Sequence, residues 1–229
     1  FALWLASDAA RVDAAFLTVT NMVVSGRAEI FAAGGAESLS AGAISPPGVT
    51  FTPDPGSYVI FDMVTGLIQA GSGFAPNNAD GITTESTNII TTSGLSGIIN
   101  TDRAFFLAGV FLGPNTPVPP APPTPIFTDA NDFSALTPEI GQVFFIGDGQ
   151  TLSGNIQQRF YVPAGATRFF LGIPDAYDGV NAFHGQPSSY ADNSGELTVT
   201  FSVVPEPASV VLIGLGLAVA VPFLRRRAR

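Results

Sequence analysis

Short apolar runs alternate with turn signals along most of the chain. Seven runs rich in Val, Ile, Phe, Tyr or Thr qualify as strands: residues 49–52, 57–64, 104–111, 142–146, 158–162, 167–173 and 196–203. Runs of this length, bounded by Gly, Pro, Asn and Asp, are typical of a β-sandwich. The pattern therefore predicts an all-β fold over residues 16–203, an antiparallel β-sandwich of jelly-roll or galactose-binding-like type.

Residues 1–207 show little of the 3.6-residue apolar periodicity that is typical of helices. Only residues 133–140 show it, for one helical turn or two. Charged residues make up 12% of the chain, and 25 glycines and 19 prolines interrupt it, a composition that disfavours long helices.

The segment 114–125 contains seven prolines and cannot be a central strand. It is either a linker that divides the body into two domains or a long surface loop in polyproline II conformation. We favour the loop, because each half would have a thin core by itself.

The first fifteen residues begin with the apolar stretch FALWLA and continue with small residues. We interpret residues 1–15 as the remnant of a signal peptide and exclude them from the fold. An ordinary first strand or helix is the alternative.

Residues 208–224 carry no charge and would rise about 25 Å as a helix, enough to cross a thin bilayer. Arg225, Arg226 and Arg227 follow directly, and the positive-inside rule keeps them in the cytoplasm and the body outside. A buried core helix is the alternative, but such a helix has a polar face and this segment is apolar all round. We expect a transmembrane helix.

The triplet Pro205-Glu206-Pro207 stands immediately before this span. Triplet, span and arginine cluster together resemble the PEP-CTERM sorting signal, which the C-terminal residues 204–229 match in order. The resemblance implies an exported protein recognised by an exosortase that removes the tail. It also implies a membrane-held intermediate in the inner membrane, delivery to the cell surface or extracellular matrix, and a host that makes extracellular polysaccharide, a possible partner.

Charge and residue types narrow the chemistry of the body. The first 208 residues hold five cations against eighteen acids, a net charge of −13, which disfavours binding to nucleic acid. The chain has no cysteine and a single histidine, His184, so the common nucleophile–base pairs are missing. We expect no enzyme. A polysaccharide hydrolase using two of Asp54, Asp62, Asp129 and Asp132 is the weaker alternative.

Oxygen ligands gather between residues 174 and 195. Asp175 and Asp178 follow one predicted strand, and Asp192 and Asn193 precede the last one. If these two strands are neighbours, the side chains meet, and calcium prefers such carboxylate and amide oxygens. The alternative is a polar turn, because Asp, Asn, Ser and Gly are also the usual turn residues.

Residues 160–201 are also similar to the galactophilic calcium lectins. The resemblance implies a calcium ion held by Asp175, the Ser189 carbonyl, Asp192 and Asn193, and a sugar held through its hydroxyls. The loop is about ten residues longer than in the lectins, and Asp192 replaces an amide. Tyr177, Phe183 and Tyr190 are either contacts for a sugar ring or hydrophobic plugs. We expect a calcium- and carbohydrate-binding surface protein, with a structural protein without ligand as the alternative.

Overall fold

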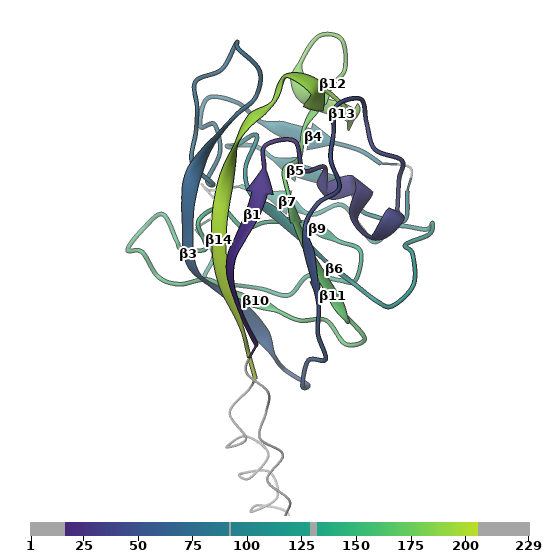
Figure 1. Cartoon of the computed structure of the whole chain (residues 1–229), viewed down its shortest axis with the longest axis vertical. Helices are drawn as coiled ribbons and strands as arrows, with labels where there is room; N and C mark the ends of the chain where they lie inside the picture. The colour runs from purple at the N-terminus through teal and green to yellow at the C-terminus, as the bar shows by residue number, and fades with distance from the viewer. Residues whose placement is uncertain (1–16, 92, 129–131, 206–229) are drawn as a thin grey trace, which may run out of the picture.

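The computed structural model describes residues 17–91, 93–128 and 132–205. They form three β-sheets and very little helix (Figure 1). The all-β, sandwich-like prediction is confirmed at this level, while the jelly-roll type stays a prediction.

The first sheet, called the β14 sheet, is built on the longest pairing in the molecule. β14 pairs antiparallel with β1 on one side and β3 on the other. Between Leu197 and Phe201 its buried side chains alternate with more exposed ones, as a strand with one face in the core requires. The strands in order are β1 (Leu17–Ser25), β14 (Ser194–Val204), β3 (Tyr58–Gln69), β10 (Arg159–Tyr161) and β8 (Ala135–Leu136).

The second sheet, called the β11 sheet, is antiparallel throughout and more deeply buried. All five side chains of β6 are buried, as the apolar sequence AGVFL leads one to expect. Its order is β2 (Gly48–Thr50), β11 (Arg168–Gly172), β6 (Ala108–Leu112) and β9 (Val143–Phe145).

A third sheet of short strands lies at one end. Its order is β12 (Ala176–Tyr177), β13 (Ala182–Pro187), β4 (Thr87–Ile89), β5 (Ile98–Asn100) and β7 (Ile126–Phe127). The β13–β4 and β5–β7 pairings are parallel, as is β10–β8 in the first sheet. The expectation of a purely antiparallel fold is therefore wrong for these short pairs, which span only two residues each.

Phenylalanine rings pack between the β11 sheet and the β14 sheet. The ring of Phe169 on β11 lies 4.6 Å from Phe111 on β6 and 5.5 Å from Phe201 on β14, centroid to centroid. Phe144 on β9 is 5.5 Å from Phe160 on β10. Such aromatic pairs add about 0.5–1.5 kcal/mol each to the effect of burial. β11 and β14 thus face each other across the core.

All seven predicted strand runs contain a strand, although residues 104–107 lie outside β6. The helical turn expected at 133–140 is wrong: the segment contains β8. Phe133 packs there against Phe127 at 6.0 Å and Phe160 at 6.1 Å, so tertiary contacts override the weak period.

The Pro-rich segment 114–125 connects β6 to β7. Gln142 donates a hydrogen bond from Nε2 to the Pro123 carbonyl, 2.9 Å away. Buried hydrophobic residues from both sides of the segment belong to one core cluster. This favours the loop over a linker between two domains.

The helices of the described residues are the short 3-10 helices η1 (Ile30–Gly35) and η3 (Tyr190–Asp192). In this part of the chain we find no helix with the length and apolarity to cross a membrane. The expected signal remnant 1–15, the span 208–224, Glu206, Pro207 and Arg225 to Arg227 lie outside the described residues.

Both ends of the described body lie at one pole, because Leu17 pairs with Val203. The β12–β13 hairpin and η3 lie at the opposite pole (Figure 1). The segment before the sorting triplet therefore leaves the body at the end remote from the third sheet.

Candidate functional site

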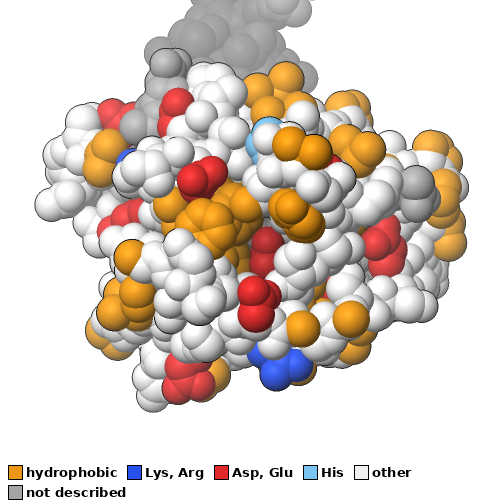
Figure 2. Space-filling view, turned by 90° about the horizontal axis from the view of Figure 1, so that it is seen from above, with side chains coloured by type: hydrophobic (Ala, Val, Ile, Leu, Met, Phe, Trp, Pro, Cys, Tyr) orange, Lys and Arg blue, Asp and Glu red, His pale blue; other side chains and the backbone are white. Residues whose placement is uncertain are grey.

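The four residues predicted as calcium ligands line one pocket at the β12–β13 pole, which we call the Asp175 pocket. Seen from this pole, hydrophobic side chains gather in the middle of the face with acidic side chains close by (Figure 2). The lining residues are Ala70, Phe74, Asp175, Ala176, Tyr177, Ala182, Phe183, Ser189, Asp192 and Asn193.

The sheets bring these residues together in a way that differs from the prediction. The strands before and after them, β11 and β14, are not neighbours in one sheet but belong to different sheets. Asp175 lies beyond the end of β11 and Asn193 just before β14, and they meet because the two sheets pack face to face. The chain between them forms β12, β13 and η3 instead of a plain loop.

Asp175 is a buried carboxylate that pairs with no cation within the described residues, and it is only 3% exposed. Its Oδ1 accepts a hydrogen bond from the Ala176 amide at 2.8 Å, and its Oδ2 accepts one from Asn193 Nδ2 at 2.7 Å. Burial raises the pKa of Asp175 to about 7 despite these bonds, with a smaller contribution from the charge of Asp192. The charged form is therefore costly at this position.

Asn193 connects three segments of the chain. Its Nδ2 donates to Asp175 and also to the Gly26 carbonyl, 3.2 Å away, at the end of β1. Its Oδ1 is buried and has no hydrogen-bond partner among the residues that the structure describes. A buried amide oxygen without a partner costs about 1–3 kcal/mol, so this atom is open to a donor or a cation.

Asp192 is exposed on η3, and its Oδ2 lies close to the Gly71 backbone, where a Cβ at position 71 would come within 2.4 Å. Ser189 is also exposed and has a φ of 68°, in the left-handed region. Asp178 does not join them: its carboxylate accepts hydrogen bonds from Val180 and Asn181 within its own turn.

The donor types of the pocket fit calcium in part. Two carboxylates and the Asn193 Oδ1 supply oxygens, and the predicted Ser189 carbonyl would add one, whereas calcium takes six to eight. The hydrogen bond from Asn193 Nδ2 to Asp175 places a donor nitrogen where a calcium ion would need an oxygen. Turning the side-chain amide over exchanges its nitrogen and oxygen at nearly the same positions. Within the described residues, no three His, Asp or Glu side chains converge on a possible metal position.

Phe74 was not foreseen as part of this site. It comes from the turn after β3, and its ring lies 5.2 Å from that of Phe183. Its distance in sequence from residues 174–195 left no local signal. Tyr190, considered as a sugar contact, is fully buried and donates to the Ile173 carbonyl at 2.9 Å, so it is a plug. The Nε2 atom of His184 lies 3.2 Å from Ser86 Oγ, at hydrogen-bond distance.

The carboxylates considered for a hydrolase lie on separate elements. Asp62 on β3 accepts a hydrogen bond from Ser202 on β14, Asp132 accepts bonds from Ser153, and Asp54 lies in the turn before β3. Asp129 lies outside the described residues.

Comparison with known proteins identifies the C-terminal segment. Residues 203–228 match the family model of the PEP-CTERM protein-sorting motif. No curated protein and no solved structure gives a significant match to the chain.

Proposed function

We propose that this exported chain, which carries the PEP-CTERM motif and is therefore sorted by an exosortase, is a non-catalytic protein of the cell surface or extracellular matrix that binds calcium in its Asp175 pocket. The motif match at residues 203–228 is the observation that carries the sorting part. The inner-membrane intermediate and delivery to the surrounding polysaccharide belong to the same proposal.

The calcium part is supported by the meeting of Asp175, Ser189, Asp192 and Asn193 in one pocket. A divalent cation would neutralise the buried Asp175 carboxylate and the nearby Asp192, and would give the Asn193 Oδ1 a partner. A calcium ion would hold these oxygens together. Where the ion is exposed to solvent, it would also bind vicinal hydroxyls of a sugar. Phe74 and the half-exposed Tyr177 would then border the sugar.

Calorimetry with the purified full-length chain tests calcium binding. We expect a dissociation constant on the order of 10⁻⁴ to 10⁻³ M, as in other extracellular modules. Asp192→Asn should weaken binding without unfolding the protein, because one anionic ligand is lost and the side-chain shape is kept. Asp175→Ala should abolish it. No calcium-dependent heat, or an unchanged signal in the Asp175 variant, would remove calcium from the proposal.

A structural protein without ligand is the second candidate, and one observation favours it. Asn193 Nδ2 joins the end of β1 to Asp175 by two hydrogen bonds, as a purely structural contact would. A thermal melt separates the two. At about 10 mM calcium the first candidate predicts about 1.4–2.7 kcal/mol of added stability over chelator, and the second predicts none. A glycan array with calcium present then tests the carbohydrate part.

A further inference from the structure

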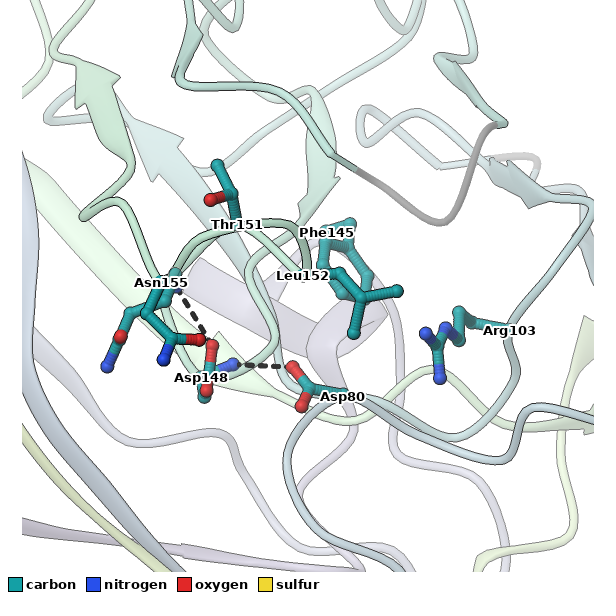
Figure 3. Close-up of a pocket in the computed structure, with 8 residues that line it drawn as sticks. Asp80, Arg103, Phe145, Asp148, Thr151, Leu152 and Asn155 are labelled. Carbon is teal, nitrogen blue, oxygen red and sulfur yellow. Dashed lines mark hydrogen bonds between the residues drawn. The ribbon is translucent and has the colours of Figure 1, made fainter.

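A second pocket, remote in sequence from the Asp175 pocket and sharing no residue with it, lies beside the turn that follows β9. We call it the Arg103 pocket. Asp80, Arg103, Asp148, Gln150, Leu152 and Asn155 are among the residues that line it (Figure 3). Its volume of about 70 Å³ is enough for several waters or one small polar group.

Arg103 is the feature of this pocket that calls for a ligand. Its side chain is only 9% exposed, and its guanidinium has no hydrogen bond or ion pair in the described part of the chain. In Figure 3 it points toward Asp80 and Leu152. The other described arginines each have a partner: Arg27 the Gly42 carbonyl, Arg159 the ring of Tyr58 and Arg168 the Gly113 carbonyl.

The guanidinium opens on the pocket, and its planar fork matches a carboxylate. Arg103 can therefore receive the carboxylate of a ligand at its end of the pocket.

Two carboxylates, those of Asp80 and Asp148, lie at the other end, beside the amides of Gln150 and Asn155. Asp80 Oδ1 accepts a hydrogen bond from the Asp148 amide at 3.0 Å, and Asp148 Oδ1 accepts one from the Gln150 amide at 2.9 Å. These bonds fix both carboxylates in place, and Oδ2 of Asp148 has no partner among the described residues. Burial, and then the charge of Asp80, raises the pKa of Asp148. A ligand group that meets these two carboxylates must donate hydrogen bonds.

These two ends select the ligand by charge. A metal cation would be repelled by Arg103, and a phosphate or sulfate dianion by the two carboxylates. One carboxylate with hydroxyl groups beside it satisfies both ends, and Leu152, which is 61% exposed, offers apolar surface for the carbons of a ring. We propose that the Arg103 pocket binds the carboxylate end of a hydroxylated acid, of which a uronic acid unit is the type that fits.

Calorimetry on the purified full-length chain in detergent tests this, with sodium D-glucuronate and sodium D-galacturonate as probes. We expect saturable heat with at least one uronate. Glucose lacks the carboxylate and acetate lacks the hydroxyls, so each should bind about tenfold more weakly or not at all. Alanine separates a hydroxylated acid from an amino acid, because its ammonium group could also meet the two carboxylates. The calcium proposal concerns another pocket, and its failure would leave this result unchanged.

Variants locate the binding. Arg103→Leu should abolish the uronate signal. Since that change also affects a buried position, circular dichroism checks its fold, and Asp148→Asn serves as a second, isosteric variant expected to weaken binding about tenfold. Arg159→Gln makes the same change of charge on an exposed arginine and should bind like the wild type.

Three results would overturn the proposal. They are no uronate binding, equal or tighter binding of alanine, glucose or acetate, and full binding by folded Arg103→Leu or by Asp148→Asn.

Discussion

Asp175 gives the molecule a pH dependence that can be measured. Its pKa is raised by burial to about 7, from an ordinary value of 3.8. The folded protein therefore holds a proton at Asp175 over a range in which the unfolded chain has released it. Stability from this group is fully present below the unfolded pKa and is lost as pH rises through the folded pKa.

We accordingly predict, in chelator, that Asp175 makes the free energy of unfolding fall between about pH 4 and pH 7 and level off above. Each pKa unit corresponds to about 1.4 kcal/mol. Asp175→Asn should remove this fall and be more stable than the wild type at pH 8. Chemical denaturation over a pH series measures it.

Asp178→Asn is the matched control for that series. The pKa of Asp178 is lowered, chiefly by hydrogen bonds from Asn181, so its small contribution has the opposite sign and is lost on acidification. If Asp175→Asn keeps the wild-type slope between pH 4 and 7, the carboxylate does not carry the raised pKa.

The sequence was enough to predict the polar residues of the Asp175 pocket, but not all of the residues that line the two pockets. Asp175, Asp192 and Asn193 were singled out because turn-rich oxygen donors stand out in a weakly charged chain. Phe74 and Arg103 were not, because nothing local distinguishes a pocket wall from the core, or a buried arginine without a partner from a solvated one.

The pairing of β14 with β3 depends on close backbone approach at Gly195. Its φ is 77°, and a Cβ there would lie 2.2 Å from the Leu67 carbonyl oxygen. Gly179 in the β12–β13 turn has a similar φ of 94°, but nothing lies within 4 Å of the position of a Cβ. A substitution at Gly179 therefore tests backbone strain alone, whereas the same substitution at Gly195 tests backbone strain together with a steric clash.

We predict that Gly179→Ala destabilises the fold by about 1–2 kcal/mol, the cost of a side chain in the left-handed region. Gly195→Ala should lose an additional amount of about 1 to 3 kcal/mol, because the strands must move apart. Thermal unfolding of both variants checks this, and equal losses would contradict the proposed role of the contact.

Strand prediction succeeded where β-branched and aromatic residues cluster, and failed elsewhere for physical reasons. β13 (Ala182–Pro187) contains Gly and Pro and was interpreted as loop, yet it pairs with β4 and β12. β1 follows the apolar start of the chain and was not identified as a strand. Which strands share a sheet is decided by packing across the core, as Phe169 and Phe201 show, and a single sequence does not contain that information.

The direction in which the chain leaves the body decides how the Asp175 pocket is oriented relative to the sorting tail. Val204 ends β14 at the pole opposite the Asp175 pocket (Figure 1). While the tail tethers the protein, this pocket would therefore face away from the membrane. A ligand-binding surface protein needs that orientation, and the sorting proposal and the site proposal are consistent in this respect.

Processing should depend on the triplet in front of the span. We predict that Glu206→Ala leaves unprocessed protein in the inner membrane, because the one charged residue of the triplet is removed at the point the exosortase recognises. Glu196→Ala on the exposed side of β14 removes the same charge nearby and should be processed normally. Cell fractionation with immunoblotting compares the two, and normal processing of both would speak against recognition through Glu206.

The intact mass of the mature protein, isolated from its native host, tests the sorting assignment most directly. Removal of the tail by an exosortase predicts a mass that lacks Arg225 to Arg229 together with the apolar segment before them. A mature protein whose mass still includes those arginines would contradict the account, and a permanent membrane anchor would take the place of a sorting signal.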